Sequence, residues 1–187
     1  MGRKLFVKRR LLVGVLLLGL LSAIPLSRAG AATPAIRSTS NVTLISDPNT
    51  VVGTSTLTRT ASGISFTLQT SGLEPGHAVT IWWMVINPDG GVAVLYGAGH
   101  VIDESGTAEF GGYLQVGDSD GSVMGDDRSL EDALQATVIL VVRDHGPAKP
   151  GMVEQQIHTF DICNPPTLPG EPLSCTDLQM SMHTVVG

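Results

Sequence analysis

Short apolar runs separated by turn residues occupy the chain from about residue 41 onward. Residues 64–70 (ISFTLQT) alternate between apolar and polar side chains, and this period of two predicts a strand that is buried on one face. Residues 77–87 (HAVTIWWMVIN) are apolar on both faces, and residues 133–142 (ALQATVILVV) form the most apolar run of the mature region. Strands buried on both faces carry such continuous runs, so we expect residues 77–87 in the middle of a sheet.

The remaining strand signals are short and are separated by turns that contain Gly or Pro. β-Branched, Thr-rich or alternating segments predict further strands at 41–46, 51–60, 92–102, 107–117, 156–162 and 176–186. An acidic loop over 118–134 is expected to end in one helical turn, where Ser129 and Asp132 have the spacing of a capping box. Eight or nine such strands, with no long amphipathic helix, predict an all-β fold. We expect an antiparallel β-sandwich over residues 41–187, immunoglobulin-like or superoxide dismutase-like.

Residues 1–31 have the three parts of a secretory signal peptide. A basic start (MGRKLFVKRR) precedes an uncharged apolar run (LLVGVLLLGLLSAI), and small residues including Ala29 and Ala31 follow it. The run is shorter than the roughly 20 residues that a membrane-spanning helix needs, so cleavage is favoured over the alternative of an uncleaved anchor. We therefore expect a secreted or periplasmic protein with no stable membrane anchor, in which residues 32–40 are a flexible lead-in.

Signal cleavage changes the charge of the chain. It would remove six of the 11 Lys and Arg residues and none of the 17 Asp and Glu residues, so the net charge would go from −6 to −12. Phosphate recognition rests on Lys and Arg, so this balance argues against a nucleic-acid partner. The partner is expected to be a protein or a small molecule instead.

The two cysteines, Cys163 and Cys175, are close to the C-terminus. Two nearby cysteines in an exported protein are expected to pair, and the proline-rich loop between them (NPPTLPGEPLS) excludes helix and central strand. In the chain-entropy model, closing a loop of this size adds about 3 kcal/mol to stability. The alternative, a two-cysteine metal or redox site, lacks a recognised spacing.

The segment 141–151 (VVRDHGPAKPG) carries the strongest candidate chemistry, because three ionisable residues end an apolar run. Histidines near the ends of other expected strands could converge on it. The resulting candidate ligand or metal cluster comprises His100, Arg143, Asp144, His145 and His158. Imidazole and carboxylate together suit zinc or copper, so either ion is the expected cofactor if a metal binds.

A structural interpretation competes with the metal site. The same polar groups could tie down the Gly- and Pro-containing loop through ion pairs, and the next segment would return Glu154 and Gln156 beside them. Loops at the end of a rigid β-fold are also where ligands bind, so a ligand site remains the third interpretation.

Other motifs have weaker functional signals. An acidic loop could bind calcium but does not fit the EF-hand pattern, and a solvated loop is the favoured alternative; its carboxylates are Asp118, Asp120, Asp126 and Asp127. Of the pair Trp82–Trp83, one indole could face a sugar, although at least one is expected in the core. Asn41 begins a glycosylation sequon. No nucleophile-elbow, zinc-protease, P-loop or dinucleotide motif is present.

Five segments together resemble a group of secreted bacterial β-sandwich proteins that have no assigned activity. They are GLEPGHAVTIWWMVIN, LYGAGHVID, GGYLQVGD, VVRDHGPAKPGMVEQQIHTF and the C…C-T-D-L-Q ending. The resemblance covers nearly the whole mature region and implies export and a β-sandwich, but no reaction. The turn at 72–76 (GLEPG) also resembles chordin-type and copper/zinc superoxide dismutase-like sandwiches, where the next strand carries an H-x-H metal pair. Here that strand reads TIWWMVI, so the copper site does not carry over.

These observations favour a non-enzymatic, exported binding domain. The alternative is a zinc- or copper-binding protein with dismutase-like or hydrolytic activity, which requires at least three of the candidate side chains to meet at one point. The binding interpretation predicts an exposed apolar or aromatic patch.

Overall fold

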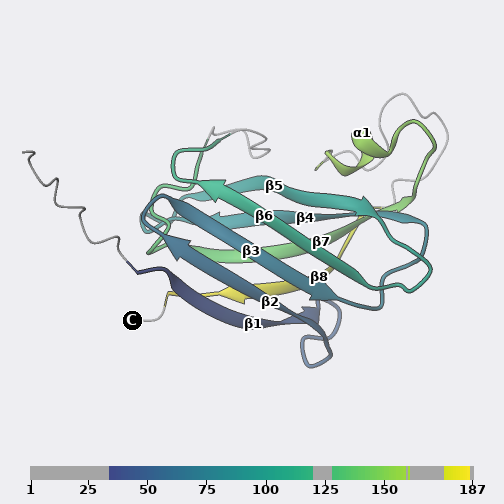
Figure 1. Cartoon of the computed structure of the whole chain (residues 1–187), viewed down its shortest axis with the longest axis horizontal. Coiled ribbons are helices and arrows are strands. Elements are labelled where there is room, and N and C mark those ends of the chain that lie inside the picture. Colours follow the sequence, from purple (N-terminus) through teal and green to yellow (C-terminus); the bar gives the residue numbers. More distant parts are fainter. Residues whose placement is uncertain (1–33, 120–127, 159, 161–174, 186–187) are drawn as a thin grey trace, which may run out of the picture. The chain divides into compact units, whose positions relative to one another are not determined.

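The computed structural model describes residues 34–119, 128–158, 160 and 175–185. These residues form eight strands and one short helix (Figure 1). The elements are β1 (Ile36–Leu44), β2 (Val51–Thr60), β3 (Gly63–Thr70), β4 (His77–Ile86), β5 (Val92–Val101), β6 (Ala108–Gln115), β7 (Thr137–Pro147), α1 (Val153–Ile157) and β8 (Thr176–His183).

All eight strands belong to one antiparallel sheet in the order β5-β4-β7-β8-β1-β2-β3-β6. The predicted all-β antiparallel class is therefore confirmed. The predicted division into two separate sheets is not confirmed, because hydrogen bonds link every neighbour in this order. The link between β8 and β1 is short, since only Thr43 and Leu44 pair with Met180 and Gln179. In Figure 1, β1, β2, β3 and β6 lie in front of the other four strands.

The sheet nearly closes on itself, because the two strands at the ends of the order approach each other. The imidazole of His100 on β5 stacks on the ring of Phe110 on β6, with 4.5 Å between the ring centroids. A side chain at Gly112 would meet the carbonyl oxygen of Gly97 at 3.0 Å. Glycine at this position therefore lets β5 and β6 come together.

The core lies between the inward faces of the strands. In β3 the predicted alternation is confirmed, since Ile64, Phe66 and Leu68 are buried. Both tryptophans are buried as well, with 1% of each exposed, so the suggestion that one indole faces a sugar is wrong. Trp83 makes an edge-on contact with the ring of Phe66, at a centroid distance of 4.7 Å.

Three local predictions differ from the structure. The expected lead-in 32–40 is already strand from Ile36, because β1 pairs with β2 from Ile36 and Arg59 onward. The strand expected at 156–162 is wrong at its start, where α1 includes Gln156 and Ile157. No helix directly follows Ser129 in the described residues; the chain forms a non-helical turn instead. In that turn the Asp132 carboxylate accepts the backbone N–H groups of Leu134 and Gln135, at 2.9 and 3.2 Å.

Candidate functional site

The Arg-Asp-His segment is part of β7, which continues to Pro147 instead of ending at Val142. Arg143 donates from Nε and Nη2 to the carboxylate of Asp177 on β8, at 2.6 and 3.0 Å. Its guanidinium lies 4.0 Å from the centroid of the Phe160 ring, and it also donates to the Phe160 carbonyl oxygen. The guanidinium of Arg143 therefore already has hydrogen-bond acceptors at its edge and an aromatic ring against its face.

Asp144 has different partners from its neighbour. Its carboxylate lies 2.9 and 3.1 Å from Nδ1 of His77 on β4, and it accepts the backbone N–H of Gly146 at 2.7 Å. Gly146 has a φ of 79°, a backbone conformation that favours glycine. Asp144 thus fixes the turn that follows and joins it to the start of β4.

His145 points into the interior, where 2% of the residue is exposed. Its Nε2 is 2.8 Å from Oγ1 of Thr80, and that oxygen accepts the indole N–H of Trp82 at 2.8 Å. Its Nδ1 is 3.4 Å from Sγ of Cys175. Burial, assisted by the charge of Arg143, lowers the pKa of His145 to about 4, so the ring is neutral at pH 7.

The other two candidate histidines lie elsewhere. Nδ1 of His158 is 2.8 Å from the Glu154 carbonyl oxygen, and its ring packs on Tyr96 at 4.2 Å. His100 is on the β5–β6 seam. Among the described residues, no group of three or more His, Cys, Asp or Glu side chains is placed to hold a metal ion. The described parts of the candidate cluster thus supply no zinc or copper ligand set.

The loop-tying interpretation has direct support from Gln156, of which 1% is exposed. Its Oε1 accepts the Lys149 backbone N–H at 2.8 Å, and its Nε2 donates to the Pro147 carbonyl oxygen at 3.1 Å. The segment after the loop therefore returns beside the cluster, as expected, but as a helix.

Several predicted sites lie partly or wholly outside the described residues. Cys163 lies outside them, so its disulfide with Cys175 stays a prediction. The signal peptide and most of the acidic loop, including Asp120, Asp126 and Asp127, also lie outside the described residues. Asn41 of the sequon is exposed on β1.

A second polar cluster, which the sequence reasoning missed, lies between β1, β2 and β8. The Ser55 hydroxyl donates to Oγ of Ser181 at 2.8 Å, so the Ser55 oxygen accepts from Nε2 of His183, 2.8 Å away. The other nitrogen, Nδ1, then accepts from the Ser38 hydroxyl at 2.9 Å. The alternation of β2 was the available signal, because Ser55 and Arg59 share the inward face of Leu57.

This Ser38–His183–Ser55 chain resembles a nucleophile with its base, but the electrostatics oppose that role. Burial and the positive charge of Arg59 lower the pKa of His183 to about 4. A general base must become an imidazolium during the reaction, and Arg59 disfavours that form. We interpret the cluster as a hydrogen-bonded part of the interior.

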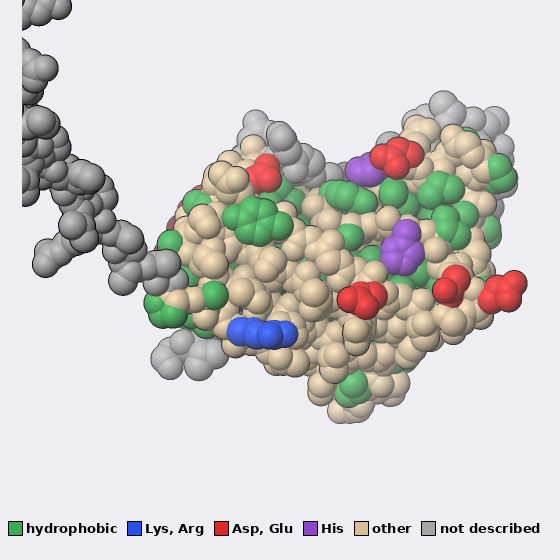
Figure 2. All heavy atoms as spheres, in the orientation of Figure 1, with side chains coloured by type: hydrophobic (Ala, Val, Ile, Leu, Met, Phe, Trp, Pro, Cys, Tyr) green, Lys and Arg blue, Asp and Glu red, His purple; other side chains and the backbone are tan. Residues whose placement is uncertain are grey.

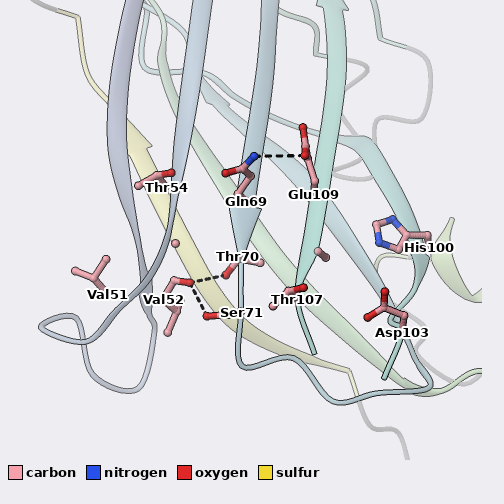
Figure 3. A pocket seen from close by; sticks show the side chains of 12 residues that line it. Val51, Val52, Thr54, Gln69, Thr70, Ser71, His100, Asp103, Thr107 and Glu109 are labelled. Atoms are coloured by element: carbon pink, nitrogen blue, oxygen red, sulfur yellow. Dashed lines mark hydrogen bonds between the residues drawn. The ribbon is translucent and has the colours of Figure 1, made fainter. Parts of the chain in front are cut away.

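An open groove of about 770 Å³ lies at one end of the sheet (Figure 3). Its floor is a row of outward side chains on neighbouring strands, Thr54, Gln69 and Glu109. Gln69 Nε2 donates to Glu109 Oε2 at 3.3 Å. His100 and Asp103 border one side in Figure 3, and Val51 borders the other.

The groove has a lining of mixed polar and apolar character and a negative charge. Asp103 and Glu109 line it, and none of its lining residues is Lys or Arg. Hydrogen bonds from the Ser105 hydroxyl and backbone N–H lower the pKa of Asp103, so that carboxylate is ionised at neutral pH. Of the five predicted cluster residues, the groove includes His100 alone.

The exposed apolar patch that the binding interpretation predicts is not borne out by the described residues. The large apolar side chains exposed on the described surface are spread over several elements; they are Ile36, Ile45, Val51, Val101, Tyr113 and Met182. One of these, Val51, borders the groove. A ligand in the groove would meet hydrogen-bonding and charged groups interspersed with small apolar side chains.

Comparison with known proteins found no matching family model, no matching curated protein and no matching solved structure. The described part of the chain contains no helix with the length and apolar character needed to cross a membrane.

Proposed function

We propose that this chain is an exported, non-enzymatic binding domain whose groove holds a polar ligand that has no negative charge. The observation that carries this proposal is the open groove of about 770 Å³ beside the sheet, where hydroxyl, amide and carboxylate groups are interspersed with small apolar side chains. Pockets of 300 to 1,000 Å³ are typical of small-molecule sites.

The ligand class follows from the lining. Two carboxylates without a lining Lys or Arg repel phosphate, sulfate and carboxylate groups. The predicted mature charge of −12 adds to this repulsion at longer range. Neutral or cationic ligands that offer hydrogen-bond donors are the ones that the groove favours.

Binding is favoured over catalysis because the groove lacks an assembled reactive pair. Thr70 donates to Gln179 Oε1 at 2.5 Å, and Ser71 donates to the Val52 carbonyl oxygen at 2.9 Å. His100 stacks on Phe110, and among the described residues no hydroxyl hydrogen-bonds to its ring. Nucleophilic catalysis needs a nucleophile and a base within hydrogen-bond reach.

We test the groove by filling it. Thr54→Trp would place an indole on the groove floor, and Met182→Trp, on an exposed position of β8, is the matched control. Titration calorimetry of the exported protein would use cellohexaose, spermine and inositol hexakisphosphate as neutral, cationic and anionic probes. We expect the neutral or the cationic probe to bind, and T54W to weaken that binding at least tenfold while M182W leaves it unchanged.

Three outcomes would contradict the proposal. The first is tightest binding of the anionic probe, and the second is no binding of any of the three probes. The third is equal affinity of the wild type and T54W, which would place the ligand outside the groove. Circular dichroism would first establish that both Trp variants fold.

A further inference from the structure

The outward side chains of β1, β2, β3 and β6 form a surface that we name the polar face. Strand register arranges them in three cross-strand rows. The rows are Asn41-Thr54-Gln69-Glu109, Thr39-Thr56-Thr67-Gly111 and Arg37-Thr58-Ser65-Tyr113. The first row includes the floor of the groove, so the groove and the polar face are continuous.

The polar face carries little charge. Arg37 and Glu109 are the charged members of its rows, and the others are mainly hydroxyl or amide side chains. Figure 2 views this side of the molecule, where most of the surface is tan, the histidines and most carboxylates lie toward the right, and acidic atoms also appear at the upper left. The chain as a whole has 17 Asp and Glu residues, so its acidic character is concentrated elsewhere.

The residue types on the polar face indicate the chemistry of a partner that would bind there. A charged partner is normally matched by opposite charges, and an apolar partner by an exposed apolar patch. The polar face offers neither. It offers groups that both donate and accept hydrogen bonds, and these complement a neutral molecule rich in hydroxyl groups.

The spacing of the rows favours an extended partner. Neighbouring strands lie about 4.8 Å apart, and side chains two residues apart on one strand are separated by about 6.8 Å. Few of these groups satisfy one another: Gln69 donates to Glu109 at 3.3 Å, and Thr39 Oγ1 and Thr56 Oγ1 are 3.5 Å apart, at the limit of a hydrogen bond. The backbones of β2 and β3 are paired on both sides, so binding would order little additional structure.

Aromatic rings flank the two ends of this surface on the β6 side. Tyr113 is 58% exposed in the third row, and His100 borders the groove near the first. Planar rings provide the flat contact on which the C–H face of a pyranose packs. By strand rise, Tyr113 and Glu109 are about 14 Å apart along β6, so one ligand reaching both must be longer than a monosaccharide.

We propose that the groove and the polar face together bind a neutral polysaccharide chain. The groove holds a short stretch of the chain, and the remainder crosses the polar face toward Tyr113. This inference rests on the proposed function, because the groove is its anchoring part.

The test compares chain lengths on a variant of the middle row. Thr39→Val, Thr56→Val and Thr67→Val in one protein would remove three hydroxyl groups and preserve side-chain shape. Thr176→Val, on an exposed position of β8, is the control. The probes are two-unit and six-unit oligomers of β-1,4-glucose, α-1,4-glucose and β-1,4-N-acetylglucosamine, measured by titration calorimetry.

For at least one of the three series, we expect the six-unit oligomer to bind at least tenfold more tightly than the two-unit one. The triple variant should remove this gain and leave two-unit binding unchanged, whereas T54W should weaken both. The Thr176→Val control should behave as the wild type.

The possible failures are distinguishable. Spermine binding in the groove without binding of any oligosaccharide overturns the polysaccharide inference and leaves the proposed function intact. Equal affinity for two-unit and six-unit oligomers, or an unchanged triple variant, removes the polar face from the site. No binding of any probe overturns both proposals.

Discussion

Replacing Arg59 with alanine is expected to lower the free energy of unfolding by about 3 to 5 kcal/mol. The side chain is buried, with 3% of the residue exposed, and three backbone carbonyl oxygens hold its guanidinium. Nη1 donates to Ala133 and Ala136 at 2.9 and 2.7 Å, and Nη2 donates to His183 at 3.0 Å. Alanine would leave these buried oxygens without their donor and would create a cavity.

Urea unfolding followed by tryptophan fluorescence measures this effect, because Trp82 and Trp83 are both buried. Arg37→Ala is the matched control, since Arg37 is exposed on the neighbouring strand β1 and should change stability by less than about 0.5 kcal/mol. A loss in Arg59→Ala no larger than in the control would mean that these hydrogen bonds contribute little. Arg59→Met, which retains much of the volume, separates the cavity from the lost donors.

Acid is expected to destabilise the domain between pH 6.5 and about 4, mainly through two buried histidines. Burial lowers the pKa of both His145 and His183 from 6.5 to about 4. The unfolded chain therefore binds protons on these residues at a higher pH than the folded chain does. Above pH 6.5 these two histidines do not lower the free energy of unfolding. That free energy falls as the pH decreases from 6.5 to about 4, and below pH 4 these groups cause little further loss.

The size of the effect follows from the shifts. One pKa unit corresponds to about 1.4 kcal/mol, so each histidine should account for a loss of about 2 to 3 kcal/mol between pH 7 and pH 4.5. Urea unfolding at both pH values would measure the total loss. His145→Gln should be less stable at pH 7 but should lose correspondingly less stability on acidification.

Surface carboxylates also protonate in acid, so the difference between variant and wild type is the informative quantity. Direct NMR titration of the imidazole signals provides the second readout. If the signals of His145 and His183 titrated near pH 6.5 in the folded protein, the predicted acid sensitivity would have no source in these residues.

Local patterns explain why most strands could be predicted. Side chains alternate between apolar and polar in β3 and are mostly apolar in β4. Each pattern is visible within the strand's own residues and does not depend on the strands that it pairs with. Strand prediction failed where pairing with other strands determined the local structure. Residues 36–40 have no strong apolar pattern, yet Ser38 bonds to His183 of β8 and the backbone pairs with β2.

The candidate cluster shows the same limit at the level of side chains. Arg143, Asp144 and His145 are adjacent in sequence, but Asp177, His77 and Thr80 bind them separately. Asp144 alternates along the strand with Arg143 and His145, and each of the three has partners of its own, so proximity in sequence did not bring these groups to one site. Of the proposed histidines, His100 alone borders the groove.

The all-β class, the approximate position of most strands and the acidic composition could be predicted from the residues, because they depend on short-range periodicity and on residue counts. The groove and the polar face depend instead on how the strands pair. Thr54, Gln69 and Glu109 are far apart along the chain and become neighbours through the register of β2, β3 and β6. The turn between β2 and β3 can fix the register of that hairpin, but β3 and β6 are separated in the chain by β4 and β5, so their register depends on long-range pairing.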